Sequence, residues 1–220
     1  MIRGVIFDMD GTLIDSMAVW DKVIEKTVCE FGVIPTDDDY SNMEALSQIQ
    51  VLQYLCDKYK QIHLSPKQLS DKMDIIVEQR YKQLSTVRHG ALELMQKLKD
   101  KNIKMSVATL TAKHQAEKVI KHHKMDKYID YIITVDEVGQ SKENPKIYLT
   151  ASEKMNVKPC ECMVCEDAPY AVKTAKQAGF ITCGITEKWY NHGKDMLVSN
   201  SDIIVKSSFE EIFDFLNDNI

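Results

Sequence analysis

Gly4-Val5-Ile6-Phe7-Asp8-Met9-Asp10-Gly11-Thr12 is the stretch of sequence that decides the fold. Its apolar run, residues 4–7, is typical of a strand buried on both faces, and the glycine-containing turn ends that strand. In open α/β sheets the chemistry gathers at the carboxyl ends of such strands, so Asp8 and Asp10 are candidates for a nucleophile and an acid/base. Taken alone, the stretch is also compatible with an acidic turn that only ends a strand, because aspartate and glycine are common turn residues.

Length and composition narrow the class of protein. The 220 residues suffice for one large domain or for a domain with a sizeable insertion. A formal charge of -5 and the lack of any lysine or arginine block argue against a nucleic-acid or membrane-surface binder, which leaves small molecules as the expected partners. No apolar run approaches the roughly 20 residues of a membrane span. We expect a cytoplasmic protein without a leader, whose six cysteines are free thiols.

The region after the first motif has a helical pattern. Apolar residues recur at helical spacing from Trp20 to Phe31, which predicts one helix that Gly32 ends. Thr36, followed by three aspartates, is a plausible N-cap, and residues 65–68 have the capping-box form with proline at the first helical position. Residues 16–86 are therefore expected to form an inserted α-helical cap domain.

From Gly90 onward, helical and strand patterns alternate along the chain. This alternation predicts parallel strands joined by crossover helices, a doubly wound Rossmann-like α/β core built from residues 1–15 and 87–220. The two links between core and cap predict a hinge that closes over a substrate, although a rigid helical subdomain is the alternative. The further strands are expected at 105–109, 131–134, 163–165, 181–184 and 203–205, with helices at 91–99, up to Lys124, and near Ile147, Ala171 and Ile212.

Chemically useful side chains follow several of these strands: Thr109, Lys142, Glu166 and Asp167. In a parallel sheet they converge with Asp8 at one edge. Clustered carboxylates repel one another unless a cation is present, and Mg²⁺ prefers such oxygen ligands. A carboxylate nucleophile, a metal and a lysine suit phosphoryl transfer, in which Asp8 attacks phosphorus to give an aspartyl-phosphate. Asp10 would protonate the departing alcohol and then accept a proton from water.

With these motifs the chain resembles the haloacid dehalogenase superfamily, in the subgroup of phosphatases and β-phosphoglucomutase-like proteins with a helical C1-type cap. The resemblance covers the chain apart from the cap, in the family's order. It implies an α/β fold, a HAD-like phosphoric monoester hydrolase and Mg²⁺ as cofactor. The segments that carry it are residues 8–16, Val107-Ala108-Thr109, residues 141–149, and Val164-Cys165-Glu166-Asp167-Ala168-Pro169 with 175–179.

The resemblance also implies roles for individual residues. Asp8 is the nucleophile and a metal ligand, and Asp10 is the acid/base that binds metal through a backbone carbonyl. Asp167 is the second metal carboxylate, and Glu166 is a ligand through water or an outer-shell residue. Phosphate would be bound by Thr109, Lys142, the backbone of Gly11 and Thr12, and the backbone N–H of Leu110, which stands where relatives commonly have serine or asparagine.

The leading functional hypothesis is a Mg²⁺-dependent phosphatase for a small phosphorylated metabolite, such as a sugar phosphate or phosphoglycolate. A β-phosphoglucomutase-like mutase is the alternative. Such mutases carry a histidine shortly after the first motif and a Gly-x-Ser-Arg segment in the cap, whereas here Trp20 lies near the first position and the cap has no arginine before Arg80. A phosphonatase with a Schiff-base lysine and a non-catalytic binding protein are less favoured.

Three other features carry weaker hypotheses. Cys160-x-Cys162-x-x-Cys165 resembles half of a zinc site, but two of its cysteines fall on an expected buried strand. Asp37-Asp38-Asp39 is expected to start a helix, with a smaller chance of affecting selectivity. For Trp189-Tyr190-Asn191-His192, a substrate contact and a packing or dimer contact are equally favoured interpretations. The sequence leaves the oligomeric state open.

Overall fold

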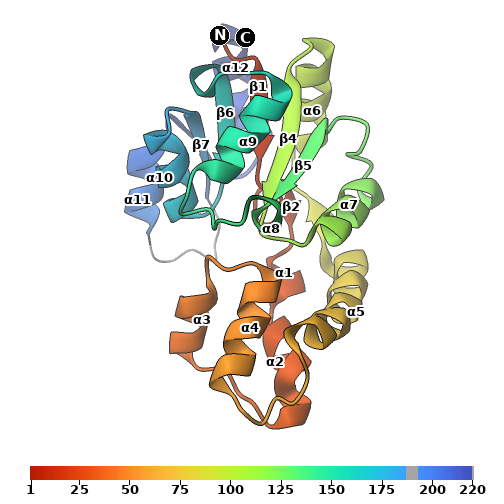
Figure 1. Cartoon of the computed structure of the whole chain (residues 1–220). Helices are drawn as coiled ribbons and strands as arrows, with labels where there is room; N and C mark the ends of the chain where they lie inside the picture. The colour runs from red at the N-terminus through yellow and green to blue at the C-terminus, as the bar shows by residue number, and fades with distance from the viewer. Residues whose placement is uncertain (187–192, 220) are drawn as a thin grey trace.

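A six-stranded parallel sheet forms the centre of the α/β core, seen here in a computed structural model that describes residues 1–186 and 193–219 (Figure 1). The strand order is β5-β4-β1-β6-β7-β8, which confirms the predicted doubly wound sheet. The strands are β1 (Gly4–Phe7), β4 (Lys104–Thr109), β5 (Tyr131–Thr134), β6 (Cys162–Glu166), β7 (Ile181–Ile185) and β8 (Ile203–Val205).

Strand β1 lies in the middle of this sheet because its side chains are apolar on both faces. Val5, Ile6 and Phe7 have no exposed surface. Ile6 packs into one hydrophobic cluster, while Val5 and Phe7 pack into another, as the alternation of side chains along a strand requires. The register pairs Phe7 with Val107 of β4 and with Cys165 of β6, so the carboxyl ends of these three strands lie together.

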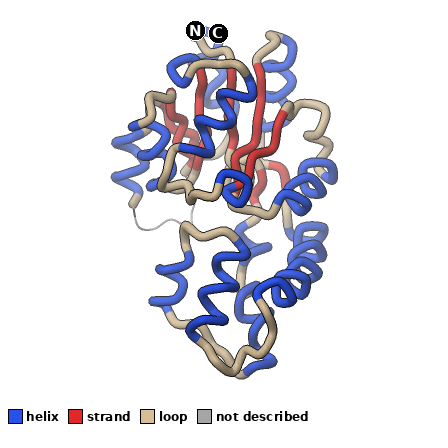
Figure 2. The backbone as a smooth tube through the Cα atoms, in the orientation of Figure 1, coloured by secondary structure: helices blue, strands red, loops and turns tan. Residues whose placement is uncertain are grey.

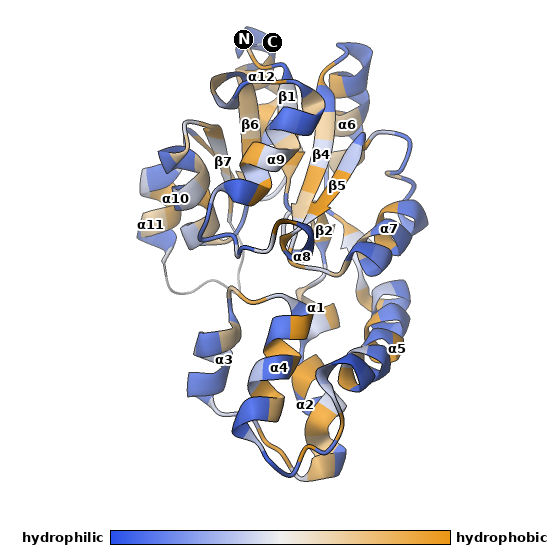
Figure 3. Ribbon diagram, viewed as in Figure 1, coloured by the Kyte–Doolittle hydropathy of each residue, from blue (hydrophilic) through white to orange (hydrophobic). Residues whose placement is uncertain are grey.

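Helices cover both faces of the sheet, and the sheet itself is the apolar interior (Figures 2 and 3). Two short helices, α8 (Val135–Val138) and α11 (Lys194–Asn200), were not predicted from the sequence. The helices of the core are α6 (Ala91–Asp100), α7 (Lys113–His122), α8 (Val135–Val138), α9 (Lys146–Met155), α10 (Pro169–Gln177), α11 (Lys194–Asn200) and α12 (Phe213–Asn219).

The cap is a group of helices beyond the carboxyl ends of the strands (Figure 1). The single helix predicted from Trp20 to Phe31 is wrong, because Lys22 has a left-handed backbone with φ 55° that breaks the helical hydrogen-bond pattern. The N-caps predicted at Thr36 and Ser65 are confirmed, each as a capping box. The cap helices are α1 (Met17–Trp20), α2 (Val23–Val28), α3 (Asp37–Met43), α4 (Gln48–Lys58) and α5 (Pro66–Leu84).

Core and cap are joined by a two-stranded ribbon that the sequence did not predict. Strand β2 (Ile14–Asp15) pairs antiparallel with β3 (Thr86–Val87). The backbone N–H of Arg88 also donates to the carbonyl of Leu13 at 2.9 Å. The predicted boundary after Asp15 lies at the cap end of this ribbon, whereas the boundary before Val87 falls inside β3. Both remain predictions.

Three sequence expectations concern parts of the chain away from the sheet edge. All six cysteines have free thiols, and Cys162, Cys165 and Cys183 are buried in strands. None of the helices in the described ranges is long and apolar enough to span a membrane. The segment Trp189-Tyr190-Asn191-His192 lies outside the described residues.

Candidate active site

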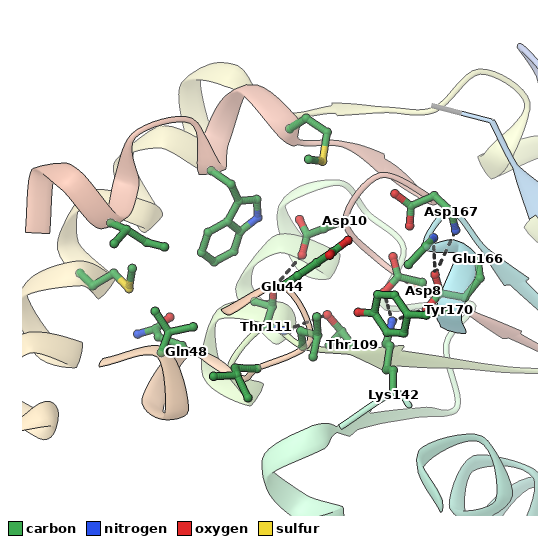
Figure 4. A pocket seen from close by; sticks show the side chains of 18 residues that line it. Asp8, Asp10, Glu44, Gln48, Thr109, Thr111, Lys142, Glu166, Asp167 and Tyr170 are labelled. Carbon is green, nitrogen blue, oxygen red and sulfur yellow. Dashed lines mark hydrogen bonds and ion pairs between the residues drawn. The ribbon is translucent and has the colours of Figure 1, made fainter. Parts of the chain in front are cut away.

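Asp8 is the first residue after β1, and it is almost fully buried at 5% exposure. Its backbone N–H donates to the carbonyl of Cys165 at 2.9 Å, which fixes the turn against β6. The Lys142 ammonium lies between two carboxylates: it contacts Asp8 Oδ1 and donates to Glu166 Oε1 at 2.5 Å (Figure 4). A lysine from the loop after α8 therefore reaches the carboxyl end of β1.

Three carboxylates meet at this point: Asp8, Glu166 and Asp167. Each offers an oxygen, and the three atoms lie within 4.8 Å of one another. Burial raises the pKa of Asp8 to about 8; Lys142 opposes this rise, and the charge of Glu166 adds to it. Burial, followed by the charges of Asp8 and Glu166, raises the pKa of Asp167 well above its ordinary value. When the three carboxylates are ionised, Lys142 neutralises only one of their charges, so this buried place carries an excess of negative charge.

This donor set fits a hard divalent cation such as Mg²⁺, because every ligand atom on offer is a carboxylate oxygen and the buried negative charge is uncompensated. Asp8 and Asp167 have oxygens available for it. Both oxygens of Glu166 are already engaged: Oε1 accepts from Lys142 and from Tyr148 Oη at 3.0 Å, and Oε2 accepts from the N–H groups of Asp167 and Ala168 at 3.0 and 3.1 Å. Glu166 therefore suits an outer-shell position better than a direct one.

The side chain of Asp10 is held away from the three clustered carboxylates. Its Oδ1 accepts hydrogen bonds from Ser16 Oγ and Tyr81 Oη, and its Oδ2 accepts one from Thr111 Oγ1, each at 2.6 Å. Because its side-chain oxygens are engaged in this way, Asp10 has its backbone carbonyl left for the predicted metal contact. Tyr81 comes from cap helix α5, so the candidate acid/base accepts hydrogen bonds from the core and from the cap.

Gly11 shapes the turn that follows. It has φ +83°, and a Cβ placed there would lie 2.2 Å from Asp167 Oδ2, so only glycine permits the close approach of the two strand ends. Arg88 donates to the carbonyls of Gly11 and Thr12 at 2.5 and 2.7 Å. Thr12 is buried, with its hydroxyl 3.5 Å from Asp167 Oδ1. These contacts fix which way the backbone of the turn faces.

A pocket of about 250 Å³ opens over these groups between core and cap. Its core side includes Asp8, Asp10, Thr109, Leu110 and Lys142, together with Asp167 and Glu166 (Figure 4). Thr109 Oγ1 accepts from the backbone N–H of Thr111 at 3.0 Å, which leaves its hydroxyl proton for another acceptor. The predicted residues from four strand ends therefore share one pocket, whereas Gly11 and Thr12 are not among the lining residues found.

Sequence reasoning missed four residues of this region: Tyr81, Arg88, Thr111 and Tyr170. Thr111 and Tyr170 had a signal, since each lies within four residues of a strand end that was already selected. Tyr81 and Arg88 had none, because Tyr81 meets Asp10 across 71 residues and Arg88 meets Gly11 across 77. Only the folded chain brings these two side chains to the motif.

The remaining sequence motifs lie elsewhere. Asp39, the third residue of the aspartate run, is buried in the cap and accepts hydrogen bonds from Tyr54 and Tyr59, each at 2.6 Å. In the described part of the chain, the one group of three or more potential ligands is the carboxylate group around Asp8, so Cys160, Cys162 and Cys165 do not converge on a common point.

The fold and the site define a hydrolase with a doubly wound core, a helical cap and an aspartate at the end of the first strand. The model of the haloacid dehalogenase-like hydrolase family matches residues 5–185, and the chain belongs to this family.

Similar proteins agree with this assignment. A phosphorylated carbohydrates phosphatase of Thermotoga maritima is 27% identical over 99% of both chains, and the Beta-phosphoglucomutase of Bacillus subtilis is 26% identical over 96% of this chain and 95% of its own. The crystal structure of CbbY from Rhodobacter sphaeroides in complex with phosphate has the same fold, with a TM-score of 0.83, 21% identity and 97% of each chain covered.

Proposed function

We propose that this protein is a Mg²⁺-dependent phosphatase that hydrolyses small phosphate monoesters. The observation that carries the proposal is the position of Asp8: it is buried in a pocket, contacts Lys142, and lies beside oxygens that suit a divalent cation. The phosphatase among its relatives supports the same reaction class.

In the first step, an oxygen of Asp8 attacks phosphorus and the bond from phosphorus to the alcohol oxygen breaks. Asp10, two residues further on, donates a proton to the departing alcohol. The product on the enzyme is an aspartyl-phosphate. In the second step Asp10 takes a proton from a water molecule, which attacks phosphorus and releases inorganic phosphate and the Asp8 carboxylate.

Lys142 and Thr109 are proposed to hold the phosphoryl oxygens. The ammonium offers positive charge, and the Thr109 hydroxyl has a free proton to donate. Asp8, Asp167 and the backbone carbonyl of Asp10 would hold Mg²⁺, which when bound neutralises charge on the phosphoryl group. Glu166 acts as a positioning residue, since it holds Lys142 and the backbone after β6.

The test is release of inorganic phosphate from p-nitrophenyl phosphate and from a panel of sugar phosphates. We expect turnover with Mg²⁺, none after EDTA treatment, and a loss of at least about 1,000-fold in Asp8→Asn. Asp38→Asn is the matched control, because it removes an exposed cap carboxylate outside the pocket. Metal-independent turnover, or an Asp8→Asn variant with full activity, would rule out the proposal.

A phosphosugar mutase is the second candidate, and the 26% identity to the Beta-phosphoglucomutase of Bacillus subtilis is the observation that favours it. A mutase passes the phosphoryl group from Asp8 to a second hydroxyl in place of water. The same sugar phosphates therefore distinguish the two, because a mutase yields an isomeric phosphosugar and little inorganic phosphate.

A further inference from the structure

The cap side of the pocket is mostly apolar. Its side chains come from four cap helices, α1, α2, α4 and α5, and from the loop between α3 and α4, and they would surround the alcohol part of a monoester whose phosphoryl group lies at Asp8. These residues are Met17, Trp20, Ile24, Leu46, Val51 and Met73.

One charged residue interrupts this apolar wall. Glu44, directly after α3, lines the pocket, and the described residues give its carboxylate neither an ion pair nor a hydrogen bond. The charge of Glu44 also acts on Tyr170, another residue that lines the pocket. Burial raises the pKa of Tyr170 above its ordinary value, and the negative charges of Glu166, Asp8 and Glu44 add to this rise. Figure 4 labels Glu44 among the side chains that line the pocket.

Nothing in the described lining compensates this negative charge on the cap side. Lys142 is the one cation among those lining residues, and it is already paired with Asp8 and Glu166. The amide nitrogen of Gln48 is engaged by its neighbours, since Nε2 donates to Ser70 Oγ at 3.1 Å and to an oxygen of Asp74 at 2.7 Å, and its Oε1 is buried without a hydrogen-bond partner among the described residues. The alcohol part of a substrate therefore meets apolar atoms and one unpaired carboxylate.

We propose that Glu44 sets the charge selectivity of the pocket, so that the preferred monoesters have a compact, partly apolar alcohol that is neutral or positively charged. A second phosphate or a carboxylate on that alcohol is disfavoured. The inference rests on the proposed phosphatase function and narrows its substrate class. Two like charges roughly 6 Å apart, at an effective dielectric constant of about 40, lower kcat/KM by about tenfold.

Three aryl phosphates of similar size test this directly: p-nitrophenyl phosphate, 4-carboxyphenyl phosphate and 4-(aminomethyl)phenyl phosphate. For each substrate the value of kcat/KM in Glu44→Gln is divided by the wild-type value, which cancels differences in leaving-group chemistry. We expect a ratio of about 10 for the carboxylate, close to 1 for the nitro compound and about 0.1 for the amine. Glu44→Lys should change the first and last ratios further in the same directions.

Asp38→Asn is again the control, and its three ratios should all stay within about twofold of 1, because that carboxylate is exposed in the same cap but does not line the pocket. Equal ratios for the three substrates in Glu44→Gln would overturn the role of Glu44. If none of the three substrates releases phosphate in an Asp8-dependent reaction, the proposed phosphatase function is overturned, and with it the role of Glu44 in selecting substrates for it.

Discussion

Replacing Asp8 by asparagine is expected to stabilise the metal-free protein at pH 8, even though it removes the proposed nucleophile. Asp8 is 5% exposed, and burial raises its pKa from an ordinary value of 3.8 to about 8. A carboxyl group whose folded pKa is raised holds its proton more tightly in the folded state. Its contribution to stability is therefore present at low pH and is lost as the pH rises from about 4 to 8.

The size of this effect follows from the shift. Each pH unit within the window costs about 1.4 kcal/mol, so about 4 kcal/mol is lost between pH 5 and pH 8. Asparagine has nearly the same shape and does not titrate, so Asp8→Asn escapes this loss. For a chain of this length 1 kcal/mol corresponds to about 2 to 4 °C in Tm, which gives the variant an advantage that grows by roughly 10 °C over the three pH units.

The assay is thermal unfolding followed by circular dichroism, in EDTA, at pH 5, 6, 7 and 8. The quantity to plot is the Tm of Asp8→Asn minus the Tm of the wild type, because the titrations of groups that do not interact with Asp8 cancel in this difference. Repeating the series with Mg²⁺ should abolish the advantage, since the wild type has the fuller set of ligands. A difference in Tm that stays constant from pH 5 to 8 in EDTA would refute the reasoning.

Three further substitutions test other parts of the structure. Tyr81→Phe removes one hydrogen bond to Asp10, worth about 1.5 kcal/mol to a charged acceptor, so Tm should fall by about 3 to 6 °C and kcat/KM should fall about tenfold in the p-nitrophenyl phosphate assay. Asp39→Ala leaves the hydroxyls of Tyr54 and Tyr59 without their acceptor, so urea unfolding should show a loss of about 3 kcal/mol in the free energy of unfolding. The same measurement on Asp38→Ala, at the exposed neighbouring position, should show a loss of less than about 0.5 kcal/mol. Gly11→Ala should reduce activity by about 100-fold, because its Cβ would collide with Asp167, whereas Gly139→Ala, with φ +67° and open space around it, should cost only about 1 kcal/mol of stability and leave activity intact.

The parallel core was predictable because its signals are local. A strand buried on both faces needs a continuous apolar run, and β1, β5 and β8 begin and end where those runs do. The convergence of Asp8, Lys142 and Asp167 followed from the sheet alone, since parallel strands present their carboxyl ends at one edge. These predictions needed only the type and the order of the elements.

The cap was less predictable because its details depend on tertiary contacts. The apolar spacing from Trp20 to Phe31 is helical throughout, yet the chain turns at Lys22. Lysine is not a residue type that predicts a left-handed backbone, so the sequence has no signal for this turn. The ribbon of β2 and β3 is only two residues long on each side, too short for any periodicity to show. The bond from Tyr81 to Asp10 likewise depends on how α5 lies against the core.

That short ribbon has a consequence for building chimaeras. The chain enters the cap through β2, which begins four residues after Asp10, and returns through β3 directly before Arg88, whose side chain holds the carbonyls of Gly11 and Thr12. A graft that exchanges caps between relatives must therefore be joined on the cap side of Ser16 and Thr86. A junction any closer to the core would import a foreign ribbon and shift the turn that carries the nucleophile.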